Sequence, residues 1–141
     1  MRIRNNAALT SLSGLENITS VGGSLSIWNN ATLTNLSGFV NITSVGGSLY
    51  IDENDVLTSL SGLENITSVG GNLSIGSYYR GNLALTSLEM TGLQRVDGDF
   101  TISGNPLLCN ILADDLMNQV LAGGGIGGTK SIHDNKECTT P

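Results

Sequence analysis

Charged, aromatic and proline residues are scarce in this chain of 141 residues. Only 13% of the residues are charged and 4% are aromatic, and there are two prolines, two cysteines and one histidine. The net charge is −6, so the basic stripe that nucleic-acid binding requires is missing. No apolar run has the length of a membrane-spanning helix. The remaining composition, rich in small and polar residues, is typical of turn-rich β architecture.

Groups of residues that carry catalysis or hold metals are also missing. The single histidine, His133, has no nucleophile or base beside it in the pattern, and with two cysteines it falls short of a zinc ligand set. The run Asp52–Asp55 offers oxygen ligands of the kind that bind calcium. Its acidic residues do not recur in the neighbouring repeats, so we interpret it as a solvated turn. We therefore expect no enzyme activity, no cofactor and no metal.

The sequence is dominated by one repeated segment. The fifteen residues LTSLSGLENITSVGG stand at Leu9–Gly23 and again at Leu57–Gly71, and Leu33–Gly47 differs from them at three positions. The repeats begin at intervals of 24, 24, 28 and 23 residues, at Leu9, Leu33, Leu57, Leu85 and Leu108. The long interval contains an insertion of four residues near Ser77–Arg80. A fixed period of this length predicts a solenoid of stacked units. Because Met1 is followed at once by residues of the repeat and no signal peptide is present, we expect a segment of a longer precursor, with Met1 an added start.

Within one repeat the spacing of the apolar residues changes. From Leu9 to Val21 they stand three apart, which matches neither an α-helix nor a strand and indicates a chain that turns corners. Leu25 and Ile27 stand two apart, as in a half-buried strand. We predict an all-β, right-handed parallel β-solenoid with about 24 residues per coil, in which the Leu-x-Ile strands stack into one parallel sheet. Glycine pairs such as Gly22-Gly23 precede these strands, and we expect them to adopt positive φ.

An asparagine follows each predicted strand at a constant offset, apart from the insertion. An inward asparagine at a tight turn can bond the backbone of its own coil and of the next one. We therefore predict a structural ladder made of Asn6, Asn30, Asn54, Asn82, Asn105 and Asn135.

The C-terminal part departs from the repeat. Residues 110–122 carry Ile111, Leu112, Leu116 and Val120 at helical spacing, and a glycine run ends the pattern. We predict a helix that caps the open end of the core. Residues 126–135 resume the frame as a last coil, where Lys130 replaces an apolar residue and protects the final sheet edge.

We divide the single domain into a repeat solenoid over 1–108, with an open N-terminal coil, and a cap over 109–141. Cys109 and Cys138 bracket the cap. Two such cysteines indicate a disulfide formed in an oxidising compartment, and a pair of free buried thiols is the alternative.

The frame L-x-x-L-x-x-L-x-x-I, followed by G-x-L-x-I-x-x-N, resembles the receptor L domain, the leucine-rich right-handed β-helix of insulin- and EGF-receptor ectodomains. Relatives of that domain occur in fungal cell-wall and bacterial surface proteins. The likeness is closest in Leu93–Cys109 (LQRVDGDFTISGNPLLC) and extends from Met1 to about Cys109. It implies an extracellular ligand-binding or wall-associated module without catalytic activity. The coils here are more regular than those of animal receptors, which favours a microbial surface protein. No ligand-contact residue can be carried over.

Aromatic residues that break the repeat are the candidate binding site. The outward positions of the predicted sheet are mostly small and polar, but Trp28 and Tyr50 depart from this pattern, and the insertion adds aromatic residues near the same side. Exposed aromatics beside an arginine are typical of binding hot spots and are suited to stacking on sugar rings. The alternative is that these rings only cover a sheet edge. The site that we predict for a protein or glycan ligand comprises Trp28, Tyr50, Asp52, Tyr78, Tyr79 and Arg80.

Three functions follow from these observations. The first is a non-catalytic extracellular module for binding, adhesion or cell-surface recognition. The second is a structural or self-assembling wall protein that associates end to end through the open coil at Met1–Asn6. The third is ice binding on stacked threonine rows such as Thr10, Thr34 and Thr58, although these rows lack the Thr-x-Thr strand that a regular array needs.

Overall fold

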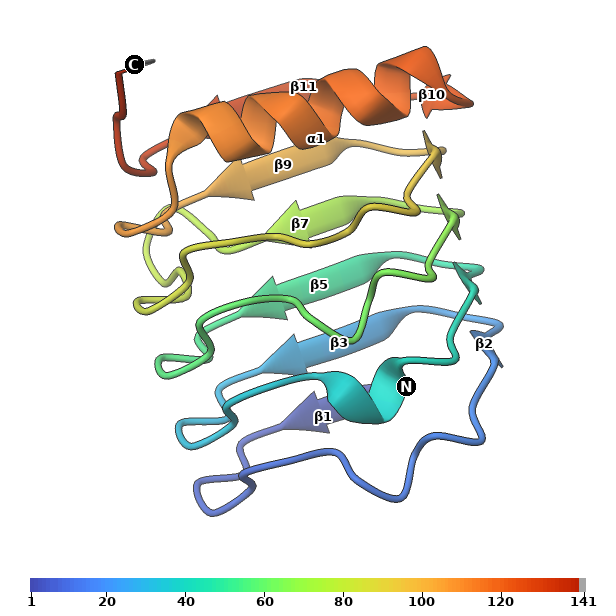
Figure 1. Cartoon of the computed structure of the whole chain (residues 1–141), viewed down its shortest axis with the longest axis vertical. Helices are drawn as coiled ribbons and strands as arrows, with labels where there is room; N and C mark the ends of the chain where they lie inside the picture. The colour runs from blue at the N-terminus through green and yellow to red at the C-terminus, as the bar shows by residue number, and fades with distance from the viewer. Residues whose placement is uncertain (140–141) are drawn as a thin grey trace.

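The computed structural model describes residues 1–139, which wind upward as a stack of coils (Figure 1). Within this range each coil adds one strand to a six-stranded parallel sheet, called sheet A here, in the order β1-β3-β5-β7-β9-β11. Its strands are β1 (Arg2–Arg4), β3 (Leu25–Trp28), β5 (Leu49–Asp52), β7 (Leu73–Ile75), β9 (Phe100–Ser103) and β11 (Lys130–His133). Equivalent residues of the first three coils lie 24 positions apart. The predicted all-β parallel solenoid is confirmed.

A second parallel sheet, called sheet B here, lies along another side of the coils. It is built from strands of two residues in the order β10-β8-β6-β4-β2. They are β2 (Ser20–Val21), β4 (Ser44–Val45), β6 (Ser68–Val69), β8 (Arg95–Val96) and β10 (Gly125–Ile126). A short 3-10 helix, η1 (Ser37–Phe39), adds a turn to the second coil. The sequence did not predict sheet B or η1, because two or three residues are too few for a period to be recognised.

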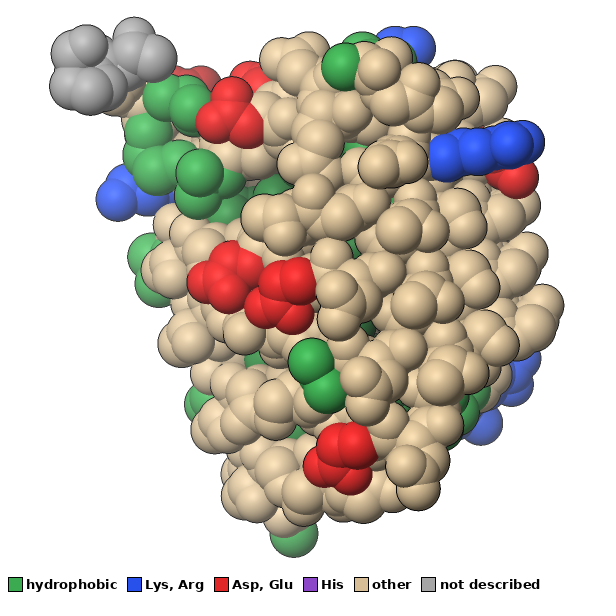
Figure 2. All heavy atoms as spheres, turned by 45° about the vertical axis from the view of Figure 1, so that its right-hand side comes forward, with side chains coloured by type: hydrophobic (Ala, Val, Ile, Leu, Met, Phe, Trp, Pro, Cys, Tyr) green, Lys and Arg blue, Asp and Glu red, His purple; other side chains and the backbone are tan. Residues whose placement is uncertain are grey.

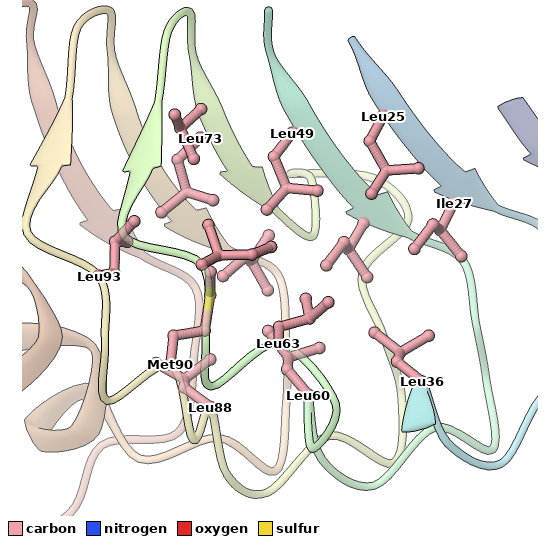
Figure 3. Close-up of a cluster of buried hydrophobic side chains, with 14 of the residues drawn as sticks. Leu25, Ile27, Leu36, Leu49, Leu60, Leu63, Leu73, Leu88, Met90 and Leu93 are labelled. Atoms are coloured by element: carbon pink, nitrogen blue, oxygen red, sulfur yellow. The ribbon is translucent and has the colours of Figure 1, made fainter. Parts of the chain in front are cut away.

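Columns of identical side chains fill the space between the sides of each coil. Leu25, Leu49 and Leu73 stack behind sheet A, and Leu36 and Leu60 belong to the opposite side of the core (Figure 3). All five are fully buried. Each side chain lies on its counterpart in the next coil, so the core exists only when several coils are stacked.

The six ladder asparagines form a continuous chain of hydrogen bonds through the interior. In the middle of it, Asn54 Nδ2 donates to the carbonyl oxygens of Ile27 at 3.0 Å and Asp52 at 2.9 Å, and to Asn82 Oδ1 at 3.3 Å. Its Oδ1 accepts from the backbone N–H of Asn30 at 3.3 Å and from Asn30 Nδ2 at 3.1 Å. The ladder therefore satisfies backbone groups that the tight turn would otherwise leave buried and unpaired.

The glycine pairs occur for a different reason from the one that the sequence indicated. Gly22 and Gly46 do not have positive φ. Several residues that directly precede a ladder asparagine do have it, such as Asn29 at 53° and Glu53 at 54°. A Cβ on Gly46 would come within 3.0 Å of the carbonyl oxygen of Gly22, closer than real Cβ atoms approach. The prediction of positive φ was wrong. Glycines such as Gly46 and Gly70 are required because consecutive coils touch backbone to backbone, whereas a Cβ on Gly22, in the first coil, would meet no atom within 4 Å.

Threonine rows tie successive coils together. The hydroxyl of Thr34 donates to the carbonyl oxygen of Thr10 at 3.1 Å, and the hydroxyl of Thr67 donates to that of Thr43 at 3.2 Å. The hydroxyl hydrogens of Thr34, Thr43, Thr67 and Thr86 are thus used inside the protein, which weakens the case for an ice-binding surface.

Helix α1 (Asn110–Ala122) lies across the C-terminal end of the stack (Figure 1), where it contacts β8, β10 and β11. It buries Ala113, Leu116 and Val120, whereas Leu112, expected to face the core, is 38% exposed. The inward face is therefore rotated from the predicted one. Gln119 Nε2 fastens the helix to the fourth coil by donating to the backbone carbonyls of Met90 at 3.0 Å and Leu93 at 2.7 Å.

A disulfide joins Cys109 to Cys138, whose Cα atoms are 5.4 Å apart. The sequence separation of 29 residues corresponds to a chain-entropy stabilisation of about 3–4 kcal/mol. Thr140 and Pro141, the last residues of the predicted cap, lie outside the described residues. Across residues 1–139, no helix has both the length and the apolar character needed to cross a membrane.

The N-terminal end of the stack carries apolar side chains that are only partly buried. Ile3, Leu9, Leu15 and Ile18 border the core there, and β1 has a partner strand on one side only among the described residues. End-to-end association through this coil stays a prediction.

Candidate ligand-binding surface

The register of sheet A arranges the outward side chains in columns. One column runs from Arg2 through Ser26 to Tyr50, and the next runs from Arg4 through Trp28 to Asp52. Alternate residues of a strand share a face, so both columns point away from the core. A small serine between two long side chains leaves a hollow in the first column.

This hollow, called the sheet-face recess here, has a volume of about 380 Å³ and is lined by Met1, Arg2, Arg4, Ser24, Ser26, Trp28 and Tyr50. The Arg4 guanidinium lies over the Trp28 ring, with its Cζ atom 5.8 Å from the ring centroid, in the range of a cation–π interaction. Tyr50 is 38% exposed. The recess therefore combines guanidinium groups, serine hydroxyls and two aromatic rings.

The insertion forms a compact projection after β7. Tyr78 and Tyr79 meet edge to face with ring centroids 4.6 Å apart, and they are 65% and 88% exposed. The hydroxyl of Ser77 donates to the carbonyl oxygen of Arg80 at 3.0 Å and accepts from the N–H of Arg80 at 3.2 Å. Arg80 Nη1 also pairs with Glu53 Oε2 at 3.1 Å. These bonds hold two aromatic rings out in solvent.

A second hollow lies between the insertion and the preceding turns. This corner pocket, as we call it, has a volume of about 300 Å³ and is lined by Asn29, Glu53, Asp55, Tyr79, Arg80, Gly81 and Leu83. Its lining contains two acidic residues and one arginine, so its charge is of the opposite sign to that of the sheet-face recess.

The two hollows have no lining residue in common, so the structure divides the predicted site residues between them. Trp28 and Tyr50 line the sheet-face recess, whereas Tyr79 and Arg80 line the corner pocket. Tyr78 lines a shallower neighbouring hollow with Asp134, Pro106 and others. Asp52 lies beside Trp28 in the register and directly precedes Glu53, which places it between the two.

Sequence reasoning left several lining residues out of the predicted site, among them Arg2, Arg4 and Glu53. The signal for Arg4 was present, because the frame that aligns Ile3 with Ile27 also aligns Arg4 with Trp28. The contact between Glu53 and Arg80 spans the insertion, and the repeat frame holds no information about it.

Burial, and secondarily the charge of Glu53, raises the pKa of Asp52 above its usual value. The pKa of Glu64 is instead lowered below its usual value, although burial alone would raise it. There, hydrogen bonds from the N–H groups of Glu64 and Gly62 and from the hydroxyl of Ser61 outweigh burial and lower it. The stability that Glu64 contributes is therefore lost as pH falls, whereas that associated with Asp52 is lost as pH rises through its folded-state pKa.

The substitution Asp52→Asn is expected to raise the melting temperature at pH 7, by about 1–3 °C. A raised folded-state pKa means that the ionised carboxylate is disfavoured in the folded protein, and the amide removes this cost. The gain should disappear near pH 3, below the ordinary pKa of an aspartate. Thermal melts of both proteins across this pH range would check it. Asp55→Asn, which removes an exposed charge nearby, is the control, and an equal gain from it would contradict the expectation.

Within residues 1–139, no three carboxylate, imidazole or thiol side chains lie close enough to hold a metal ion. In the acidic turn after β5, the Glu53 carboxylate is already paired with Arg80.

The face shown in Figure 2 consists mostly of uncharged polar groups and backbone, with scattered acidic side chains, basic side chains toward its edges and few hydrophobic ones. The stacked parallel sheets and the leucine-rich core define the class of this protein as a β-solenoid repeat protein.

Residues 1–120 match the family described as receptor L domain, and the chain belongs to this family. The match runs past the repeats into α1, further than the resemblance seen in the sequence. No curated protein matches the chain in sequence. The receptor L domain is an extracellular, ligand-binding and non-catalytic type of domain.

Proposed function

We propose that this protein is a recognition or adhesion module, secreted or held at a cell surface, that binds a protein or glycan ligand through the sheet-face recess and the corner pocket. One observation carries the proposal. The aromatic residues that break the repeat border two hollows at the surface, with Trp28 partly buried and Tyr50 and Tyr79 exposed, and none of them belongs to the core.

The column that contains Tyr50 supports this interpretation. Its other positions on the strands to the C-terminal side are Ser74, Thr101 and Ser131, so small polar residues are sufficient for the fold. A tyrosine at this place adds no core contact but offers a rigid ring to a ligand at low entropic cost. The exposed rings of the insertion have the same property.

Binding to glycan and protein arrays should depend on these aromatic rings. The triple variant Trp28→Ala/Tyr50→Ala/Tyr79→Ala is expected to lose at least about tenfold in affinity for any ligand that the wild type retains, because truncating a hot-spot residue costs more than 1 kcal/mol. The matched control is Ser74→Ala/Thr101→Ala/Ser131→Ala, which alters the same sheet face without touching a ring. Equal signals from wild type and the aromatic variant would refute the proposal.

The alternative that the rings only cover a sheet edge makes a different prediction for the same variants. It places the loss in thermal stability and leaves binding unchanged. Melting temperatures recorded beside the array signals therefore separate the two explanations.

A further inference from the structure

We infer that the sheet-face recess binds an acidic sugar, a pyranose ring that carries a carboxylate, as part of an extracellular polysaccharide. This inference rests on the proposed function and names the ligand class for one of its two hollows.

The first argument is charge. The chain has six lysines and arginines against twelve acidic residues, yet Arg2 and Arg4 stand two residues apart on the outward face of β1. Among residues 1–139 neither forms a salt bridge, whereas Arg80 and Arg95 are paired with Glu53 and Asp97. Two guanidinium groups are therefore available at one place on an otherwise acidic molecule, and they favour a negatively charged ligand there.

The second argument is that Arg4 is held in position. Its guanidinium lies over the Trp28 ring, and this stacking restricts a long side chain that would otherwise lose entropy on binding. A guanidinium presents its N–H groups in a planar fork that matches the two oxygens of a carboxylate. Because Arg4 forms no salt bridge among residues 1–139, its N–H groups remain to be donated to a ligand.

The third argument is the chemistry of the side chains that line the sheet-face recess. Ser24 and Ser26 line the floor of the recess, and Tyr50 stands on its far side from Arg2. Ser24 Oγ accepts the N–H of Ser48 at 3.0 Å, so its own hydrogen remains to be donated. Hydroxyl groups and an aromatic ring around a recess of about 380 Å³ suit the hydroxyls and the apolar face of a sugar. A peptide partner is anchored by apolar pockets, and the floor of this recess is polar.

The test uses isothermal titration calorimetry on the full chain with two probes, tetragalacturonic acid and the same oligosaccharide with its carboxyl groups reduced to alcohols. The acidic probe is expected to bind, and the neutral one to bind at least about tenfold more weakly, because the charge-assisted hydrogen bonds are lost. Arg4→Gln and Trp28→Ala should each weaken the acidic probe by about tenfold or more. Arg95→Gln makes the same change in net charge on sheet B, and we expect it to change the affinity less than about twofold.

Three results would overturn the inference: no binding of the acidic probe, equal binding of both probes, or equal losses from Arg4→Gln and Arg95→Gln. The last would show a general charge effect. In each case the proposed function survives if another array ligand, such as a protein, still depends on Trp28, Tyr50 and Tyr79. It fails separately if no array signal depends on them.

Discussion

Asn54→Ala is expected to lower the free energy of unfolding by about 3–6 kcal/mol, a large part of the total for a domain of this size. The substitution removes a side chain that gives hydrogen bonds to Ile27, Asp52 and Asn82 and takes two from Asn30. Asn54 is fully buried, so water does not reach any of these groups in the folded protein. Each buried polar group left without a partner costs about 1–3 kcal/mol, and alanine leaves no room for enough water to replace them all.

Urea unfolding of the wild type and the variant, with linear extrapolation to water, would measure the loss. Asn6→Ala is the matched control, since Asn6 occupies the same ladder position in the first coil but is exposed. Its backbone N–H keeps its bond to Asn30 Oδ1, so we expect a loss of about 1 kcal/mol. Similar losses at the two positions would show that burial does not decide the strength of the ladder.

Gly70→Ala is expected to cost about 2–4 kcal/mol, although alanine is the smallest possible change. The added Cβ would come within 3.0 Å of the carbonyl oxygen of Gly46, which is backbone and cannot rotate away. The two coils cannot separate either without loss, because the N–H of Gly70 donates to the carbonyl of Val45 at 2.8 Å. Steric overlap must therefore be relieved by breaking hydrogen bonds between coils.

The chain contains its own control for this prediction. Gly22 occupies the equivalent position in the first coil, where a Cβ would find no atom within 4 Å. Gly22→Ala is therefore expected to change stability by less than about 0.5 kcal/mol. Chemical unfolding of both variants tests the pair, and an equal loss from Gly22→Ala would mean that backbone freedom, not contact between coils, explains these glycines.

Repetition made most of the fold predictable. The pair Leu25 and Ile27 identified a strand of sheet A, and its recurrence identified the sheet, because stacking requires the same spacing in every coil. The constant offset to Asn30 and Asn54 predicted the ladder positions, and allowing for the four inserted residues identified Asn82 as well. Sheet B and η1 were missed, since segments of two or three residues show no period.

The candidate site was predictable only in part. Residues that depart from the repeat, such as Trp28 and Tyr50, stand out in the sequence because their neighbours in the same column are small. Their separation from Tyr79 into two hollows did not follow from the sequence, because it depends on the direction of side chains after an irregular insertion. The contact between the Arg4 guanidinium and the Trp28 ring joins residues that are 24 positions apart in the sequence and lie side by side only in the stacked coils.

The order of residues alone was enough to establish the number and length of the coils, the inward leucines and the ladder asparagines, because each of these repeats with the chain. The tertiary structure decided everything that depends on which atoms meet between coils. It showed that Gly46 and Gly70 are glycines because backbone lies against backbone, that threonine hydroxyls bond the preceding coil, and that an arginine-lined recess lies apart from an acidic pocket. The physical reason is distance: a repeat period states which residues are equivalent, whereas contacts and hollows are set by the few ångströms between one coil and the next.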